Sequence, residues 1–275
     1  MRWDRVWAIA RVDLKRLFKS RDYWIPMSLL AGVFFVVMPF FMLSAMSSVS
    51  ATSLVQQIGG VLESLPGPIQ EGLQGQSPEG RAAYAFAVYL LAPIAIIVPL
   101  TISSAVGANT IVGERERGTG EFLAHSPLTE REIYVGKLIA SVIPGYLATV
   151  VGFAIYSLIV NLKVGPEVGG WFFPTAGWWV LILWVVPPFI AIALSVILWV
   201  SARVKSAAAA QQASTLVTLP IIVIAYAISS GLIFDPTRSA LAVGLVAWII
   251  AGIGLASGGK AVNRERLLGI GMEGS

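Results

Sequence analysis

Residues 112–137 read VGERERGTGEFLAHSPLTEREIYVGK and hold five acids and three arginines. This charged segment lies between two long stretches that lack charged residues, 82–113 and 138–162. Ionisable side chains are costly inside hydrocarbon, so uncharged stretches are where a chain can cross a membrane. The pattern predicts two membrane spans joined by a charged connection outside the bilayer.

The composition of the whole chain agrees with this. Of the 275 residues, 56% are hydrophobic and 12% are charged, which leaves too little polar surface to cover a soluble globule. Six intervals lack charged residues, and each reaches the roughly 20 residues that a transmembrane helix needs. We therefore expect an all-α membrane protein with six transmembrane helices, at 25–46, 83–111, 134–161, 176–201, 208–233 and 238–258.

The N-terminal segment has two faces when it is drawn as a helix. Aromatic and apolar residues fall on one face, and basic residues fall on the other: Trp3, Trp7, Ala10, Leu14, Leu17 and Phe18 against Arg5, Lys15, Arg16 and Lys19. Such a pattern is typical of a helix that lies in the membrane interface, although an ordinary basic flank is the simpler alternative. We expect an interfacial (elbow) helix over residues 1–24.

The distribution of basic residues predicts the orientation. With a cytoplasmic N-terminus, sixteen of the 19 Lys and Arg residues are inside, and only Arg81, Lys163 and Arg238 are outside. Because inner loops of membrane proteins carry the excess of Lys and Arg, both termini and the charged segment should be cytoplasmic, in a multi-pass protein of the inner (plasma) membrane. Residues 1–275 then form one transmembrane domain, with an extracellular loop at 47–82 and a cytoplasmic tail at 259–275.

Within the charged segment the sequence predicts a short separate helix. Gly118 interrupts the preceding helix, and Thr119 is suited to cap the next one. Glu121 falls near the positive N-terminal end of that helix, while Phe122 and Leu123 give it an apolar tip. An apolar tip inside a charged rim is the usual anatomy of a small protein-docking site.

The short helix should end at Ser126-Pro127. Thr129 is followed three residues later by Glu132, which is the spacing of a capping box at the start of the next long helix. The stop at Ser126-Pro127 and the new helix start at Thr129 separate the short helix from the next span, so we expect it to lie at the cytoplasmic surface.

These residues closely resemble the cytoplasmic signature of the permease subunits of type 2 ABC exporters. The matching positions are Gly113-Glu114-Arg115-Glu116-Arg117-Gly118-Thr119, Glu121, Leu123, Ser126-Pro127-Leu128, Arg131-Glu132-Ile133 and Gly136-Lys137. The resemblance implies six spans, an N-terminal interfacial helix and a cytoplasmic coupling helix between spans two and three.

The resemblance also implies the function. The chain would be the permease subunit of an ATP-driven exporter, coupling ATP hydrolysis by a separate ATP-binding subunit, present in two copies, to efflux by alternating access. The substrate would be a drug, a lipid-like molecule or a peptide, and a second permease copy would complete a homodimer or a heterodimer among the membrane lipids. The docking residues implied are Glu114, Arg117, Gly118, Thr119, Glu121, Phe122, Leu123 and Pro127, with a second contact at Arg203 and Lys205.

The sequence gives no sign of a catalytic, cofactor or metal site in this chain. It has no cysteine and a single histidine, His125, which lies in the charged segment. Gly254, Gly259 and Lys260 match part of a phosphate-binding loop, but Ala261 replaces the Ser or Thr that would hold magnesium. We therefore expect a non-catalytic subunit without nucleic-acid partners, with ATP and Mg bound in the partner ATPase.

Polar residues in the spans have two open interpretations. They are Thr101, Ser104, Asn109, Gln211, Thr215 and Thr218. Small polar side chains commonly make hydrogen bonds between membrane helices. They could instead line a substrate path, because spans two and five border the path in the family that the chain resembles.

Two other classes of function remain as alternatives. One is an ion-coupled carrier, although such carriers usually hold ionisable residues inside their spans and this chain has none there. The other is a membrane channel or scaffold that is assembled through the cytoplasmic loop.

Prolines and aromatic residues give two further expectations. Prolines should kink the spans, because each removes a backbone hydrogen bond; they are Pro26, Pro39, Pro93, Pro99, Pro144, Pro187, Pro188 and Pro220. Aromatic residues before the fourth span should form a belt at the outer membrane surface; they are Trp171, Phe172, Phe173, Trp178 and Trp179.

Overall fold

The structure of the chain, a computed structural model, describes residues 1–46, 70, 72–204, 206–229 and 236–258. All regular elements in these residues are helical, as the sequence predicts. They are α1 (Trp3–Lys19), α2 (Arg21–Gly32), α3 (Met38–Met46), α6 (Pro78–Ala85), α7 (Ile94–Glu116), α8 (Gly120–Ala124), α9 (Glu130–Lys163), α10 (Gly165–Val168), α11 (Ala176–Val180), α12 (Val186–Ser201), α13 (Ala207–Ser229) and α14 (Pro236–Gly258).

Three expectations fall largely or wholly outside the described residues. These are most of the loop expected at 47–82, the last residues of the span expected at 208–233, and the tail at 259–275. Gly259, Lys260 and Ala261 of the partial phosphate-loop pattern lie in that tail.

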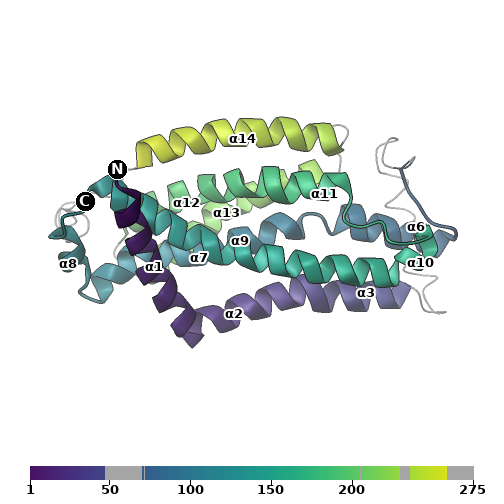
Figure 1. Cartoon of the computed structure of the whole chain (residues 1–275), viewed down its shortest axis with the longest axis horizontal. Coiled ribbons are helices and arrows are strands. Elements are labelled where there is room, and N and C mark those ends of the chain that lie inside the picture. Colours follow the sequence, from purple (N-terminus) through teal and green to yellow (C-terminus); the bar gives the residue numbers. More distant parts are fainter. Residues whose placement is uncertain (47–69, 71, 205, 230–235, 259–275) are drawn as a thin grey trace.

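The long helices run side by side along one axis of the molecule, and α1 crosses them at one end (Figure 1). The N-terminus and α8 lie at this end, whereas α6 and α10 lie at the opposite end (Figure 1). α7 is the central helix and packs against α9, α12 and α13, while α12 also packs against α14. The pair α2 and α3 lies at the edge, against α9.

Among the residues that the structure describes, four helical stretches are long and apolar enough to cross a membrane. They are Arg21–Met46, Pro78–Glu114, Glu130–Lys163 and Ala176–Ser201. Two shorter apolar stretches, Ala208–Ile224 in α13 and Ala240–Ala256 in α14, also lie among the described residues. The chain is thus a membrane-embedded, multi-pass helical protein.

The faces of α1 differ from those expected. Val6, Ile9, Ala10 and Leu17 are buried, whereas Trp3, Trp7 and Phe18 are exposed. Grouping Ala10 and Leu17 with the tryptophans was therefore wrong, because these two residues pack inward while the aromatic residues point outward.

α1 comes very close to α9 at Gly136. A Cβ atom at Gly136 would lie 2.8 Å from Cβ of Ile9 and 3.1 Å from the carbonyl oxygen of Val6, too close for any side chain. The glycine in the motif Gly136-Lys137 is therefore what allows α1 to pack on α9.

Three prolines are preceded by a wider, π-helical turn. These turns are Val33–Val37 before Pro39, Phe86–Leu90 before Pro93 and Leu181–Val185 before Pro187. A proline ring collides with the carbonyl group four residues earlier, and in each case that carbonyl belongs to the π-helical turn. The other prolines of these helices, Pro26, Pro99, Pro144, Pro188 and Pro220, lie within α-helices that continue past them.

The turn before Pro93 leaves two carbonyl groups for side chains to satisfy. The N–H of Leu91 bonds to Phe86 O, the N–H of Ala92 bonds to Tyr89 O, and Pro93 has no N–H. The hydroxyl group of Tyr156 donates to Ala87 O at 2.6 Å, and Nε1 of Trp178 donates to Val88 O at 2.9 Å. Buried carbonyl groups in a membrane need such partners, since water cannot supply them.

The expected aromatic belt is only partly correct. Trp171 and Trp179 are exposed, but Phe173 and Trp178 are buried. Trp178 stacks on Phe153 and Tyr156, and Asn161 accepts hydrogen bonds from the N–H groups of Phe172 and Phe173. Part of the aromatic segment therefore belongs to the packed core, toward the end of the bundle that carries α6 and α10.

Tyr156→Phe should lower the free energy of unfolding by about 1–3 kcal/mol, because it leaves the buried Ala87 carbonyl group without a donor. Unfolding of the purified chain in detergent, by heat or by a denaturing detergent, measures the change. Tyr134→Phe is the matched control: Tyr134 donates only to the hydroxyl group of Ser195, which itself donates to Ala191 O. Equal stability of the two variants would contradict this role of Tyr156.

Candidate functional site

The candidate site starts where α7 ends. Gly118 has a φ of +68°, a left-handed conformation that most side chains disfavour. The N–H of Thr119 bonds to Glu114 O at 2.8 Å, as in a Schellman motif. The chain therefore leaves α7 by a defined turn, and α8 follows at once.

Thr119 does not cap α8 with its side chain, contrary to expectation. Its hydroxyl group donates instead to the carbonyl group and the carboxylate of Glu114. The residue thus ties the start of α8 to the end of α7.

α8 displays its apolar tip as expected, but only in part. Phe122 is 80% exposed, and Glu121 beside it is exposed too. Leu123 is half-buried against the core and Ala124 is buried. α8 therefore rests on Leu123 and Ala124 and presents Phe122 and Glu121 to the outside.

The loop after α8 is held at both of its ends. Ser126 Oγ donates to Leu123 O at 2.6 Å, and the exposed Pro127 accepts a hydrogen bond from Arg5 NH1 through its carbonyl group at 2.7 Å. The predicted capping box of Thr129 and Glu132 is confirmed. Glu132 also accepts a hydrogen bond from the backbone N–H of Arg2 at 2.8 Å, which links α9 to the start of α1.

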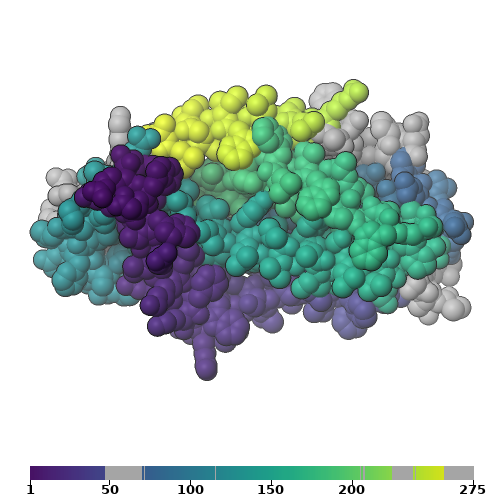
Figure 2. Space-filling view, in the orientation of Figure 1, coloured from purple at the N-terminus to yellow at the C-terminus, as the bar shows by residue number. Residues whose placement is uncertain are grey.

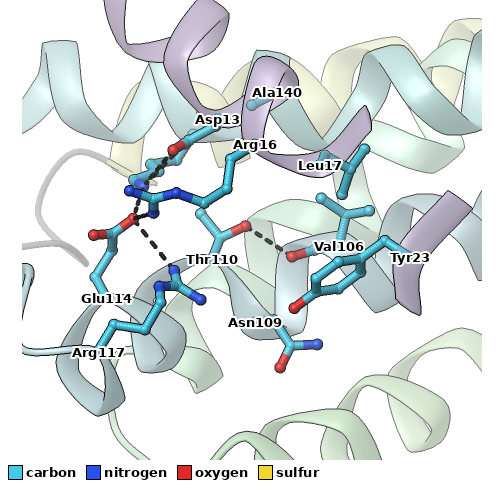
Figure 3. Close-up of a pocket in the computed structure, with 11 residues that line it drawn as sticks. Asp13, Arg16, Leu17, Tyr23, Val106, Asn109, Thr110, Glu114, Arg117 and Ala140 are labelled. Atoms are coloured by element: carbon cyan, nitrogen blue, oxygen red, sulfur yellow. Dashed lines mark hydrogen bonds and ion pairs between the residues drawn. The ribbon is translucent and has the colours of Figure 1, made fainter. Parts of the chain in front are cut away.

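Behind α8 lies a cluster of charged residues centred on the buried Glu114 and Lys137, drawn in Figure 3. Oε1 of Glu114 lies 3.0 Å from Nζ of Lys137, 3.0 Å from NH1 of Arg16 and 3.4 Å from NH2 of Arg117. Lys137 in turn lies 2.9 Å from Asp13. Glu114 and Lys137 are only 6% and 3% exposed.

This cluster joins α1, α7 and α9. A buried charge is tolerated only when its partners compensate the loss of hydration, so removal of one partner destabilises the others. Glu114 was expected on the docking surface, but its carboxylate points inward to these cations. Glu114 therefore holds the start of α8 in place through Thr119.

A groove of about 410 Å³ runs between α1 and α8. Ala8, Ile9 and Val12 of α1 form one wall, and Phe122 and Leu123 form the other. Charged residues of the cluster lie at its base: Asp13, Arg16, Glu114 and Lys137. An apolar side chain of a partner protein fits such a groove.

The second expected contact is only partly described. Arg203 is exposed, and its guanidinium group lies 3.4 Å from the centre of the Trp199 ring while NH1 donates to Trp199 O. Lys205 lies outside the described residues.

The six expected path residues lie in three different environments. Ser104 and Thr218 are buried and 3.2 Å apart, in a hydrogen bond between α7 and α13. Thr101, Gln211 and Thr215 are exposed on these two helices. Asn109 lines a small cavity of about 60 Å³ beside the charged cluster (Figure 3).

The sequence analysis did not predict the ion cluster around Glu114 and Lys137, which includes Asp13. Asp13 lies on the same helical face as the buried residues Ile9, Ala10 and Leu17, and an acid in an apolar stripe requires a cation nearby. The sequence thus indicated that Asp13 needs a cationic partner. That this partner is Lys137 depends on how α1 packs on α9.

Comparison with protein families gives one match. Residues 7–237 match the family described as ABC-2 family transporter protein. The matched region runs from α1 to the start of α14 and includes the whole candidate site. No individual curated protein matches the sequence.

Lys137→Met should destabilise the chain by about 3–5 kcal/mol, because it leaves Glu114 and Asp13 without their shared cation. Amide hydrogen exchange should accelerate in α1 first, since the cluster joins that helix to α7 and α9. Lys15→Met, at an exposed position on α1, is the control and should leave exchange unchanged. Unchanged exchange in the Lys137 variant would show that the cluster does not hold α1.

Proposed function

Because the chain belongs to the ABC-2 transporter family, and is thus a permease subunit of an ABC transporter, we propose that it exports its substrate using ATP that a separate ATP-binding subunit hydrolyses. The observation that carries this proposal is the exposed Phe122 on a short helix that a buried ion cluster supports. ATP and Mg bind in the partner subunit, and the permease itself is not catalytic.

The docking surface consists of α8 and the groove beside α1. Phe122 enters a pocket of the ATP-binding subunit, and an apolar residue of that subunit enters the groove lined by Val12 and Leu123. Glu121 lies in the polar rim of this contact. Arg203 and Lys205 add a second contact from the next inner loop.

The coupling follows from how α8 is attached. Thr119 ties it to α7, and Leu123 packs on the core, so a push on α8 acts on α7 rather than bending a loop. ATP closes two ATP-binding subunits, the two copies of α8 move toward each other, and the spans tilt to open an outward path. The π-helical turns before Pro39, Pro93 and Pro187 are where the spans bend.

The membrane topology has six spans with both termini in the cytoplasm of an inner (plasma) membrane. The four long apolar stretches and the two shorter ones in α13 and α14 support this layout. The N-terminus and α8 lie at the same end of the bundle (Figure 1), as two cytoplasmic segments should. α1, with its exposed Trp3 and Trp7, lies in the inner membrane interface.

Two permease copies meet along α7 and α13. Exposed polar side chains are costly against lipid, so Thr101, Gln211 and Thr215 are better covered by a second copy or by a polar path between copies. Small neutral polar residues suit an amphipathic cargo, whether a drug, a lipid-like molecule or a peptide. A homodimer is the simplest arrangement.

Phe122→Ala combined with Glu121→Lys should weaken binding of the ATP-binding subunit about 30-fold or more, as loss of an interface hot spot does. Co-purification and substrate-stimulated ATPase activity should fall together, while the amount of permease in the membrane stays normal. Phe41→Ala is the matched control, because Phe41 is 64% exposed on α3, away from α8.

Unchanged binding and turnover in the α8 variant would remove the docking role. Transport that follows a proton or sodium gradient without ATP would identify an ion-coupled carrier instead. Flux that needs neither ATP nor a gradient of a coupling ion would identify a channel.

A Thr215→Cys variant should cross-link to a second copy when a short thiol-reactive cross-linker is added. The chain has no cysteine of its own, so every cross-link reports on the introduced residue. Leu245→Cys on α14, also exposed, should stay monomeric. A monomeric Thr215 variant would contradict a homodimer that meets along α13.

A further inference from the structure

A second groove, apolar and unrelated to α8, lies on the membrane-facing side of the bundle. It has a volume of about 310 Å³ and runs between α2 and α9. Ala31 and Gly32 on one wall and Ala148 on the other are small, which keeps it open. A Cβ atom added at Gly32 would meet no atom within 4 Å.

The groove is as long as one leaflet of a bilayer. Its lining runs from Trp24 to Val36 on one side and from Pro144 to Ile155 on the other. At 1.5 Å per helical residue these are about 18 Å and about 17 Å. The hydrocarbon core of a membrane is roughly 30 Å thick, so the length of the groove is close to the depth of one leaflet.

Two cations, Lys19 and Arg21, lie in the chain next to residues that line one end of the groove. Phe18 and Trp24 line this end, and between them the chain turns from α1 into α2. Lys19 and Arg21 in that turn are exposed, with Asp22 the one acid beside them. In Figure 2, α1 (dark purple) crosses the visible face and the lighter purple residues that follow it lie along the lower edge of the molecule, so the turn between α1 and α2 lies at the surface.

We propose that this groove binds one anionic phospholipid of the cytoplasmic leaflet, with an acyl chain along α2 and α9 and its phosphate group against Lys19 and Arg21. An apolar channel of one leaflet's depth fits an acyl chain, and cations at its interfacial end fit an anionic headgroup. A second copy of the chain fits less well, because a two-fold axis through the groove would bring the same cations together.

The site is independent of the docking surface on α8. It requires only that α1 lies in the membrane interface and that α2 crosses the inner leaflet. Failure of α8 to bind an ATP-binding subunit would therefore leave this inference intact.

The test compares dioleoyl phosphatidylglycerol with dioleoyl phosphatidylcholine, offered in equal amounts to the full-length chain in detergent. Native mass spectrometry counts the lipid retained. Phosphatidylglycerol should be preferred, and each of Lys19→Gln and Arg21→Gln should reduce its retention about fivefold. Lys163→Gln, at the far end of α9, should change nothing.

A second pair of variants tests the groove itself. Gly32→Leu fills it and should reduce phosphatidylglycerol retention about tenfold. Gly252→Leu on α14, where a Cβ atom also meets nothing within 4 Å, is the matched control and should retain lipid as the parent chain does. The exposed charge variants keep the test decisive if Gly32→Leu folds poorly.

Three results would overturn the proposal. One is equal retention of the two lipids by the parent chain. Another is full retention by Gly32→Leu. The third is cross-linking of two copies through Val151→Cys in the groove, which would identify a second copy as its occupant.

Discussion

The buried carboxylate of Glu114 is the constraint on which the candidate site depends. It lies on α7 within 3.4 Å of cationic groups of Arg16 on α1, Lys137 on α9 and Arg117 just after α7, and water reaches almost none of it. Because an uncompensated charge in such a place costs several kcal/mol, the packing of α1 and α9 against α7 is energetically coupled to this ion cluster. α8 follows directly from this assembly: it begins after the turn that Thr119 fixes onto Glu114, and it rests on Leu123. The position of Phe122 therefore depends on the buried carboxylate of Glu114.

Toward the end of the bundle that carries α6 and α10, buried backbone carbonyl groups need hydrogen-bond partners, and uncharged side chains supply them. Prolines and π-helical turns free backbone carbonyl groups there, and Tyr156 and Trp178 donate to two of them. In the loop before α11, Asn161 Oδ1 accepts hydrogen bonds from the N–H groups of Phe172 and Phe173. Charged side chains thus hold the helices together at the end that carries α8, and uncharged side chains satisfy the backbone toward the end that carries α6 and α10. The turn after α7 and the π-helical turn before Pro93 are thus both held by specific hydrogen bonds.

Much of this architecture could be predicted from the sequence because hydrocarbon imposes a simple rule on charge. The uncharged intervals predicted where long helices lie, and the spacing of Thr129 and Glu132 predicted the start of α9. The faces of α1 could not be predicted, because two apolar stripes compete and only packing on Gly136 decides which is buried. The role of Glu114 was misjudged for a related reason: in a segment rich in charge, sequence alone does not say which acid turns inward. The groove between α2 and α9 left no mark in the sequence, since it depends on small residues of two helices far apart in the chain.

The unequal exposure of the charges around α8 has a practical consequence for handling the complex. Dissolved ions screen exposed charges such as that of Glu121 but hardly reach the pair formed by Glu114 and Lys137. A wash at high ionic strength should therefore weaken the charged rim around α8 while the contacts that join α1, α7 and α9 stay in place.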